Sequence, residues 1–491
     1  MSAENISYDR KPMIKDEDWW AAWLGLLIFA LGLGPIFGLD LLGWAVKSSV
    51  WINLSDALKP VSDAYGNLSG VQSLLLTYLF LLAITTIGAT VMGGNTKKYI
   101  AGFTIIFFIT MTCVVVGQIA YIGATPDKLD KFGIPWALGL GEMGYVIAMV
   151  VGLIIGNFFL GFANFLKEAA KPEWFIKTGI VILGASIAIK TIGAMGLATT
   201  VIVRGLCAVV EAYLIYWPVV YFIARKYFKF TPEWAAPLAS GISICGVSAA
   251  IATGSAIRAR PIVPVILSAV IIVFVAIELL FLPWLATALL YQDPMVAGAW
   301  MGLAVKSDGG AIASGAITDS LVRAKALKEL GINWEEGWIL MVTTTTKVFI
   351  DIFIGVWAFV LAVIWSVFRI DKNQGANTGG KVRAREIWDR FPKFIIGFAL
   401  AFFILLIAGI NQPGIVESAE KGVNSANAFR SILFALCFFS IGLITNVRKL
   451  WQAGMGRIVT VYAVALFCFI LWVGLFISWL FYHGVMPPVV G

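Results

Sequence analysis

Ser240-Gly-Ile-Ser-Ile-Cys-Gly-Val-Ser-Ala-Ala-Ile-Ala-Thr-Gly-Ser-Ala-Ile257 is built from small and hydroxyl-bearing residues, yet it lies between hydrophobic segments long enough to cross a bilayer. A second stretch, Met301-Gly-Leu-Ala-Val-Lys-Ser-Asp-Gly-Gly-Ala-Ile-Ala-Ser-Gly-Ala-Ile317, closes with a similar string. Backbone at membrane depth can leave the regular helix only where protein or a wet cavity satisfies its polar groups. Two Gly-rich stretches of this kind are typical of the discontinuous helices that form a transporter's binding site.

The composition indicates that most of the chain lies in a bilayer. Of 491 residues, 60% are hydrophobic and 13% are charged, whereas a soluble domain is roughly half apolar and about a quarter charged. We interpret the net charge of +8 as basic cytoplasmic loops rather than a nucleic-acid-binding surface. One His and five scattered Cys form no zinc or haem pattern, and no Walker motif or hydrolase triad is present. We therefore expect neither an enzyme nor a bound metal or cofactor.

The hydrophobic segments predict an all-α integral membrane protein with about 13 transmembrane segments, most of which have the apolar length that a spanning helix needs. The stretch 39–70 is too polar to span, and we expect it to hold a short amphipathic piece on the membrane surface. The predicted segments are 19–38, 71–93, 99–122, 137–164, 177–200, 205–224, 235–257, 262–288, 296–317, 337–367, 390–411, 428–446 and 457–482.

Lys and Arg predict the orientation, because cytoplasmic loops carry an excess of these residues. The N-terminal tail and the basic loops all lie inside if the N-terminus is cytoplasmic and every segment crosses. The exceptions are Arg258 and Arg260, which this count places outside. The regions expected along the chain are a cytoplasmic tail (1–18), an additional transmembrane region (19–135), the first part of the core with broken segments 235–257 and 296–317 (136–368), a basic cytoplasmic linker (369–393) and a C-terminal transmembrane part (394–491).

A short internal repeat predicts an inverted-repeat architecture. Leu183–Gly196 aligns without gaps with Ile441–Gly454, so that Gly184 matches Gly442 and Lys190 matches Arg448. By the charge count the first copy runs outward and the second inward, which is the arrangement of inverted-repeat transporters. The likeness between 240–257 and 301–317 is either a second sign of the repeat or a shared composition.

The first Gly-rich stretch offers polar groups without a charge. A helix break near Gly246 would free backbone N–H groups and a helix N-terminus to hold an anion. The alternative is close helix packing through small residues, for which Gly246, Ala250 and Gly254 have the right spacing. The predicted substrate-binding residues of this stretch are Ser243, Cys245, Gly246, Ser248 and Thr253.

The second Gly-rich stretch carries charge, and a charge at the bilayer centre costs about 2.5–3.5 kcal/mol on insertion scales. In a broken helix Lys306 and Asp308 can both face one cavity, where Lys attracts an anion and Asp pairs with it or takes a proton or Na⁺. The alternative is a neutral salt bridge that locks two helices. The predicted substrate-binding residues here are Lys306, Ser307, Asp308, Gly309 and Gly310.

A third set of polar residues lies on the segment 337–367. Lys347 and Asp351 are four residues apart and share a helix face. With Thr346 they are the predicted coupling or gating residues, and a structural salt bridge is again the alternative. Glu211 and Glu278 also lie within apolar runs, without an obvious partner in the sequence.

Four segments carry a family resemblance. Ser243-Ile-Cys-Gly-Val-Ser-Ala resembles the Ser-Ile-Cys-Gly segment of the bacterial sulfate exporter family, the YeiH-like proteins. Further similar segments follow in order, and the resemblance covers roughly residues 137–482; they are Ala148–Asn157, Leu183–Ala188 and Phe439–Thr445. The resemblance implies a multi-pass secondary carrier of the bacterial inner membrane, with an inverted-repeat fold and export of sulfate or sulfite.

The chain departs from this family where charge is expected. The family's His-Glu or His-Asp pair is replaced by Lys306, Ser307 and Asp308, the Arg of the next helix by Lys347, and an earlier Arg by Ser186. Positive charge therefore persists at two of these positions, while the His that titrates near neutral pH is lost.

We expect a secondary active transporter of a small anion such as sulfate, sulfite or a sulfonate, working by alternating access in the bilayer. H⁺ or Na⁺ is the expected coupling ion, and analogy with similar folds suggests a homodimer. A cation/proton antiporter with an intramembrane Asp and Lys is the alternative. A receptor or scaffold that transports nothing is the third class.

Overall fold

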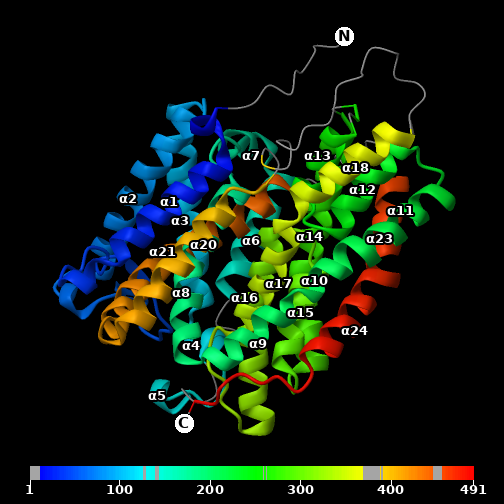
Figure 1. Cartoon of the computed structure of the whole chain (residues 1–491). Helices are drawn as coiled ribbons and strands as arrows, with labels where there is room; N and C mark the ends of the chain where they lie inside the picture. Colours follow the sequence, from blue (N-terminus) through cyan, green and yellow to red (C-terminus); the bar gives the residue numbers. More distant parts are fainter. Residues whose placement is uncertain are drawn as a thin grey trace.

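The computed structural model describes residues 12–124, 129–138, 143–257, 259–260, 262–368, 388, 391–445 and 456–490. The chain is almost entirely helical there (Figure 1), because in a bilayer a helix satisfies every backbone polar group within its own segment. The exception is the polar stretch 39–70, where β1 (Val46–Ser48) pairs antiparallel with β2 (Leu58–Pro60). The amphipathic piece predicted there is therefore a small hairpin with short 3-10 turns.

The helices form two bundles, which lie on opposite sides of the molecule in Figure 1. The first bundle consists of α1 (Glu17–Gly32), α2 (Gly70–Val91), α3 (Thr96–Gly117), α6 (Met143–Phe158), α7 (Leu160–Leu166), α8 (Pro172–Gly193), α20 (Phe394–Asn411) and α21 (Val416–Ile444). Its tightest packing joins α6, α8, α20 and α21.

The second bundle starts where the chain leaves α8. It consists of α9 (Met195–Gly205), α10 (Cys207–Val209), a π-helical stretch (Val210–Tyr216), α11 (Trp217–Lys226), α12 (Pro232–Ser243), α13 (Val247–Ala256), α14 (Ile262–Leu290), α15 (Pro294–Ala304), α16 (Asp308–Leu330), α17 (Trp338–Ile352), α18 (Ile354–Phe368), α23 (Gly456–Ala465), a second π-helical stretch (Leu466–Ile470) and α24 (Leu471–Tyr482). Contacts between the bundles are sparse and come mainly from α8 against α9 and α16.

The number of spans is lower than predicted. Among the described residues, 10 helices or helix runs are long and apolar enough to cross a membrane, and α6 with α7, bent by 118°, raises the number to 11. All predicted segments except two correspond to one of these. The two exceptions are 235–257 and 296–317, the Gly-rich stretches, and each of them is interrupted by a break between two helices, of which α16 extends on to Leu330.

The first Gly-rich stretch folds back on itself as the upper hairpin, α12 and α13. Thr253 Oγ1 donates to Ser240 Oγ over 2.6 Å, which joins the two arms across their length. Beyond α13, the backbone N–H of Arg260 donates to Glu233 at the start of α12 over 2.7 Å. The segment therefore leaves on the face where it entered, the upper face in Figure 1. Arg260 therefore lies on the same face as the start of α12, and not on the opposite face as the count of segments predicted. Arg258 lies outside the described residues.

The second Gly-rich stretch forms the lower hairpin, α15 and α16, which enters from the opposite face. The Lys325 ammonium in the last third of α16 lies 4.4 Å from the centre of the Tyr291 ring, just before α15 begins. Both arms pack on α17, where Gly298 meets the Ile339 carbonyl and Gly315 meets the Thr343 side chain. The similar strings noted in the sequence fall on the second arm of each hairpin.

The repeat predicted from 183–196 and 441–454 can be followed over its first half only, because 446–455 lies outside the described residues. Gly184 and Gly442 both lie at helix crossings, the first against the Phe398 carbonyl of α20 and the second against the Met149 carbonyl of α6. Small residues let helix backbones approach closely in a membrane, where packing rather than water drives association.

We expect Gly442→Ala to destabilise the first bundle. Its methyl group would collide with the Met149 carbonyl, and both helices are fixed by their other contacts. Overpacking of this kind costs about 1–3 kcal/mol. A lower thermal unfolding midpoint in detergent is the expected result. Gly196→Ala on α9, with open space around the added methyl group, is the control; equal midpoints for the two variants would contradict the packing argument.

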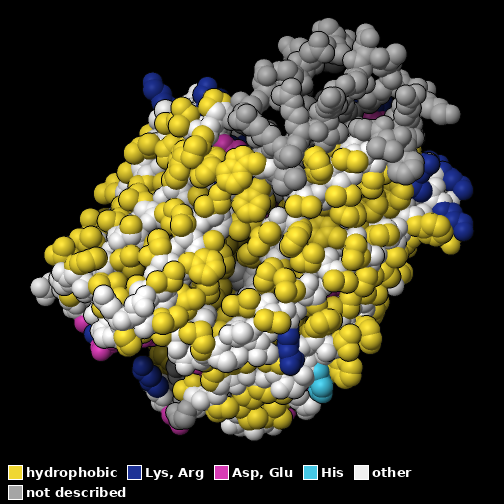
Figure 2. All heavy atoms as spheres, viewed as in Figure 1, with side chains coloured by type: hydrophobic (Ala, Val, Ile, Leu, Met, Phe, Trp, Pro, Cys, Tyr) yellow, Lys and Arg dark blue, Asp and Glu magenta, His cyan; other side chains and the backbone are white. Residues whose placement is uncertain are grey.

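The outer surface is suited to lipid. Figure 2 shows apolar side chains over the whole helical band of this face, with Lys and Arg near its ends. Large apolar residues are exposed on both bundles, among them Leu79, Ile154, Leu214, Phe403 and Trp472. A soluble protein rarely exposes so continuous an apolar surface, so the chain is a multi-pass membrane protein.

Candidate functional site

The two hairpins meet at their tips, and this contact depends on one glycine. Gly246 lies in the break between α12 and α13 with φ +72°, a conformation that L-residues with a side chain rarely adopt. Its Cα lies directly against the Lys306 carbonyl in the break between α15 and α16, so that no Cβ fits there. The breaks predicted from the two Gly-rich stretches are therefore confirmed, and they lie next to each other.

Two carboxyl groups and one lysine are buried at these tips, and we call them the first charge cluster. Asp308 begins α16, while Lys347 and Asp351 share one face of α17. Lys347 Nζ lies 3.9 Å from Asp308 Oδ1 and donates to the Ile244 carbonyl in the upper hairpin's break over 2.9 Å. All three charged residues are at most 2% exposed. The predicted coupling pair and the predicted Asp308 thus form one group.

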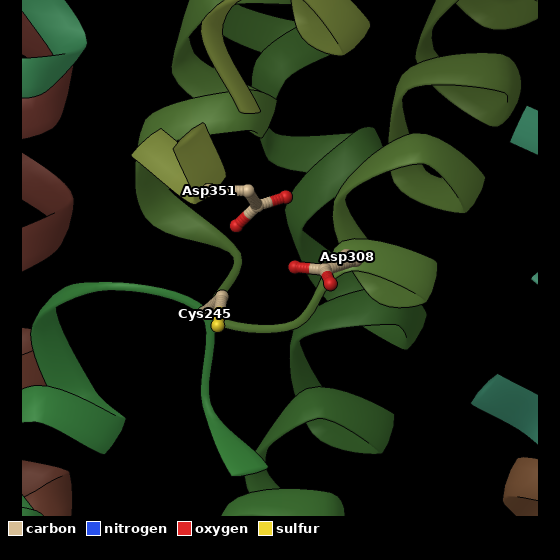
Figure 3. A group of neighbouring side chains, drawn as sticks. All are labelled: Cys245, Asp308 and Asp351. Atoms are coloured by element: carbon tan, nitrogen blue, oxygen red, sulfur yellow. The ribbon is translucent and has the colours of Figure 1, made fainter. Parts of the chain in front are cut away.

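Cys245 completes this cluster. Its Sγ and one oxygen each of Asp308 and Asp351 lie within 4.8 Å of one another, which is close enough to hold a metal ion. Figure 3 shows the two carboxyl groups facing each other, with the Cys245 sulfur below them. Asp308 Oδ1 and Asp351 Oδ1 are buried and have no hydrogen-bond partner among the described residues. One lysine thus faces two carboxyl groups that are incompletely satisfied.

Lys306 belongs to a second charge cluster on the neighbouring side of the tips. Its ammonium lies 4.4 Å from the centre of the Tyr216 ring and interacts electrostatically with Glu211 and Glu278. The backbone N–H of Lys306 donates to Glu278 over 3.4 Å. All three charged residues of this cluster are 0% exposed. Lys306 is therefore the cation that interacts with the two glutamates, although its ammonium donates to the Leu303 carbonyl and no ion pair joins it to either carboxyl group among the described residues.

The other predicted site residues hold the local structure together or pack against neighbours. Ser307 caps α16 by accepting from the Gly310 N–H over 2.8 Å, and Thr346 donates to carbonyls of its own helix. Thr253 closes the upper hairpin, as described above. Ser248 lies in the first turn of α13 and is partly exposed, Gly309 packs on Ile176 of α8, and the buried Ser243 hydroxyl has no hydrogen-bond partner among the described residues.

Two adjoining cavities lie beside α21, and the sequence did not predict them. Their volumes are about 540 and 350 Å³. They share lining residues from α6, α21 and the approach to α17, namely Tyr145, Asn424, Asn427, Arg430, Ser431 and Glu336. The smaller cavity also touches α8 and the middle of α16, so it follows the boundary along which the two bundles meet.

The sequence comparisons identify the family. The family described as conserved hypothetical protein 698 matches residues 111–461, which is most of the chain. The chain belongs to this family. The matched region contains both hairpins, both charge clusters and most of the cavity-lining residues.

Relatives of the conserved hypothetical protein 698 family extend the match to the N-terminal helices. A UPF0324 membrane protein of Nitrosomonas europaea is 43% identical over 481 residues, which cover 97% of this chain and 98% of the relative. A UPF0324 membrane protein of Rhodopirellula baltica is 30% identical over 400 residues, 81% of this chain and 64% of the relative. An uncharacterized protein of Archaeoglobus fulgidus is 47% identical over 170 residues, 30% of this chain and 88% of the relative.

The two UPF0324 names describe membrane proteins, and none of the three names states a substrate. The predicted family membership is therefore confirmed only at the level of a UPF0324-type membrane protein, and sulfate export stays a prediction. No solved structure matches the chain significantly.

Proposed function

We propose that the chain is a secondary active transporter that moves a small anion by alternating access. The observation that supports this most is the pair of hairpins, which enter from opposite faces and bring their breaks together beside buried charge. Broken helices at membrane depth that line a site are typical of such carriers. Buried ionisable groups inside a membrane protein are functional candidates by default, because each is costly to keep there.

The arrangement of the bundles supports the same proposal. Both charge clusters lie within the second bundle, whereas the smaller cavity lies between the two bundles. Sparse contacts between bundles allow one to move as a body relative to the other. Such a motion would expose the hairpin tips to either face in turn. The predicted orientation, with the upper face cytoplasmic, is part of this proposal.

A cation/proton antiporter is the second candidate, and the charge count favours it. If Asp308, Asp351 and Lys347 were all ionised, two carboxylates would face one ammonium and leave one negative charge in a buried place. A proton or a bound cation would balance that charge. The Cys245, Asp308 and Asp351 atoms are close enough to hold such a cation, and Lys347 would compete with it.

Flux through proteoliposomes tests and separates the candidates. For an anion carrier we expect uptake of at least one labelled anion from a set of sulfate, sulfite, small sulfonates and carboxylates, dependent on the protein. For an antiporter we expect proton movement that follows an imposed Na⁺ gradient without any of these anions. Movement of neither the anions nor protons would contradict both candidates and favour a receptor or scaffold.

A further inference from the structure

One half of α21 turns a polar face toward the two cavities. Asn424, Asn427, Arg430 and Ser431 all line both cavities, and their spacing of three, four and seven residues places them on one side of the helix. Apolar residues dominate the other faces of α21, where Phe429, Leu433 and Phe438 are buried among neighbouring helices. A polar stripe that lines a cavity is suited to a polar occupant.

Arg430 is the cation of this stripe that is not neutralised. Its Nε is buried without a hydrogen-bond partner, and no carboxylate of the described chain lies within salt-bridge distance of its guanidinium. The guanidinium carbon lies 5.6 Å from the centre of the Phe434 ring, which holds the group in place. An arginine fixed in this way presents N–H donors to the cavity in a planar fork.

The other two cations that line the smaller cavity are already paired. Lys190 Nζ lies 2.8 Å from Glu335 Oε1, and Arg323 Nε lies 2.8 Å from Asp319 Oδ2. Arg323 also lies 3.7 Å from Glu336. Their charges are compensated by the protein itself, so Arg430 is the group in this cavity from which an anion would gain most.

A neighbouring amide adds a neutral donor beside Arg430. Ser186 of α8 donates to Asn427 Oδ1 over 2.8 Å, and the Ser431 hydroxyl donates to the Asn427 carbonyl over 3.0 Å. The first bond orients the Asn427 amide and leaves its N–H₂ group as a donor. A guanidinium fork and an amide are donors that bind planar or tetrahedral oxyanions.

We infer that Arg430, with the Asn427 amide that Ser186 orients, binds a small oxyanion such as sulfate or a sulfonate in the smaller cavity, between the bundles. The inference rests on the proposed anion transport, since it assigns that transport an entry site. Ala316, which lines the same cavity, is eight residues from Asp308 along α16. At 1.5 Å per residue that is about 12 Å, so the bound anion would lie about two helical turns from the hairpin tips.

Anion binding to the purified full chain in detergent tests the inference, with sulfate and methanesulfonate as probes and chloride at matched ionic strength as reference. We expect a rise in the thermal unfolding midpoint with either probe. Arg430→Gln should raise the dissociation constant at least about 10-fold, which corresponds to about 1.4 kcal/mol. The dissociation constant of Arg430→Lys protein should lie between those of the native and Arg430→Gln proteins, because lysine keeps the charge and lacks the planar guanidinium.

Lys190→Gln is the matched control, since Lys190 lines the same cavity but is paired with Glu335. Its dissociation constant should change by less than about 3-fold, well under the effect of a lost charge-assisted contact. Native protein that binds the probes no better than chloride would overturn the inference, as would equal effects of Arg430→Gln and Lys190→Gln.

The flux assay separates failure of this site from failure of the proposed function. If proton movement is coupled to transport but no oxyanion binds, the site is wrong and a secondary transporter remains. If Arg430→Gln loses anion binding but the native chain moves no anion, the site is supported and anion transport is wrong.

Discussion

Asp351→Asn protein will be at least as stable to heat as the native chain, yet it will have lost coupled proton or cation movement. The substitution leaves one carboxylate for one ammonium in the first charge cluster, which removes the uncompensated buried charge. Nothing then requires a proton or cation to enter. We expect coupled flux to fall by about 100-fold, the lower end of what a positioned proton carrier contributes. Unfolding midpoints in detergent and flux in proteoliposomes measure the two effects.

Asp319→Asn is the control for this prediction. Asp319 is as deeply buried, on the same helix as Asp308, but it accepts from Arg323 and from the backbone N–H groups that begin α17. This substitution should lower stability, because the amide N–H₂ that replaces Oδ2 cannot accept from Arg323 Nε. A native level of coupled flux in Asp351→Asn protein would show that the first charge cluster is a structural salt bridge. A marked loss of stability in that variant would contradict the charge count.

Lys306→Met should be the most destabilising single substitution in the second charge cluster. It leaves Glu211 and Glu278 without their cation at a fully buried place. The Lys306 ammonium is in direct contact with neither carboxyl group, so we expect the unfolding free energy to fall by less than the about 3–5 kcal/mol that a broken buried ion pair costs. Adding Glu211→Gln and Glu278→Gln to the same protein removes the stranded charges and should recover most of the loss. Denaturant or thermal unfolding of the three proteins in one detergent measures this.

Lys421→Met is the matched surface control for Lys306→Met. Lys421 also has a glutamate partner, Glu417 at 2.8 Å, but both side chains are largely exposed. Exposed ion pairs of this kind contribute little to stability, so we expect no measurable change in the free energy of unfolding or in the unfolding midpoint. If Lys306→Met were as harmless as Lys421→Met, Lys306 would not be the charge that holds the second cluster together.

The sequence located the helix breaks but not the number of crossings. Small and polar residues at 240–257 and 301–317 predict interrupted helices, and the breaks occur at Ile244–Gly246 and Val305–Ser307. Hydropathy cannot distinguish a crossing helix from a hairpin, since the two short arms together have the length of one span. Only the tertiary contacts Thr253–Ser240 and Arg260–Glu233 show that the upper hairpin returns to its own face.

The first charge cluster was largely predictable, and the rest of the site was not. Asp308, Lys347 and Asp351 stand out because charge inside an apolar segment is costly. The grouping of Lys306 with Glu211 and Glu278 joins segments about 30 to 100 residues apart, so no local pattern reports it. The polar face of α21 was missed because the predicted segment began at 428, whereas the helix begins at Val416.

The order of the two bundles along the chain has a consequence for biogenesis. Residues 195–368 build most of the second bundle, then α20 and α21 return to the first, and α23 and α24 come last. These last helices receive hydrogen bonds from Tyr216 to the Ile470 carbonyl and from Trp300 to the Leu471 carbonyl. During synthesis, the second bundle therefore stays incomplete until α23 and α24 have entered the membrane. Until then α24 does not cover Glu211, which lies next to Gly474 in the finished fold, so an unfinished chain exposes a carboxyl group that is later buried.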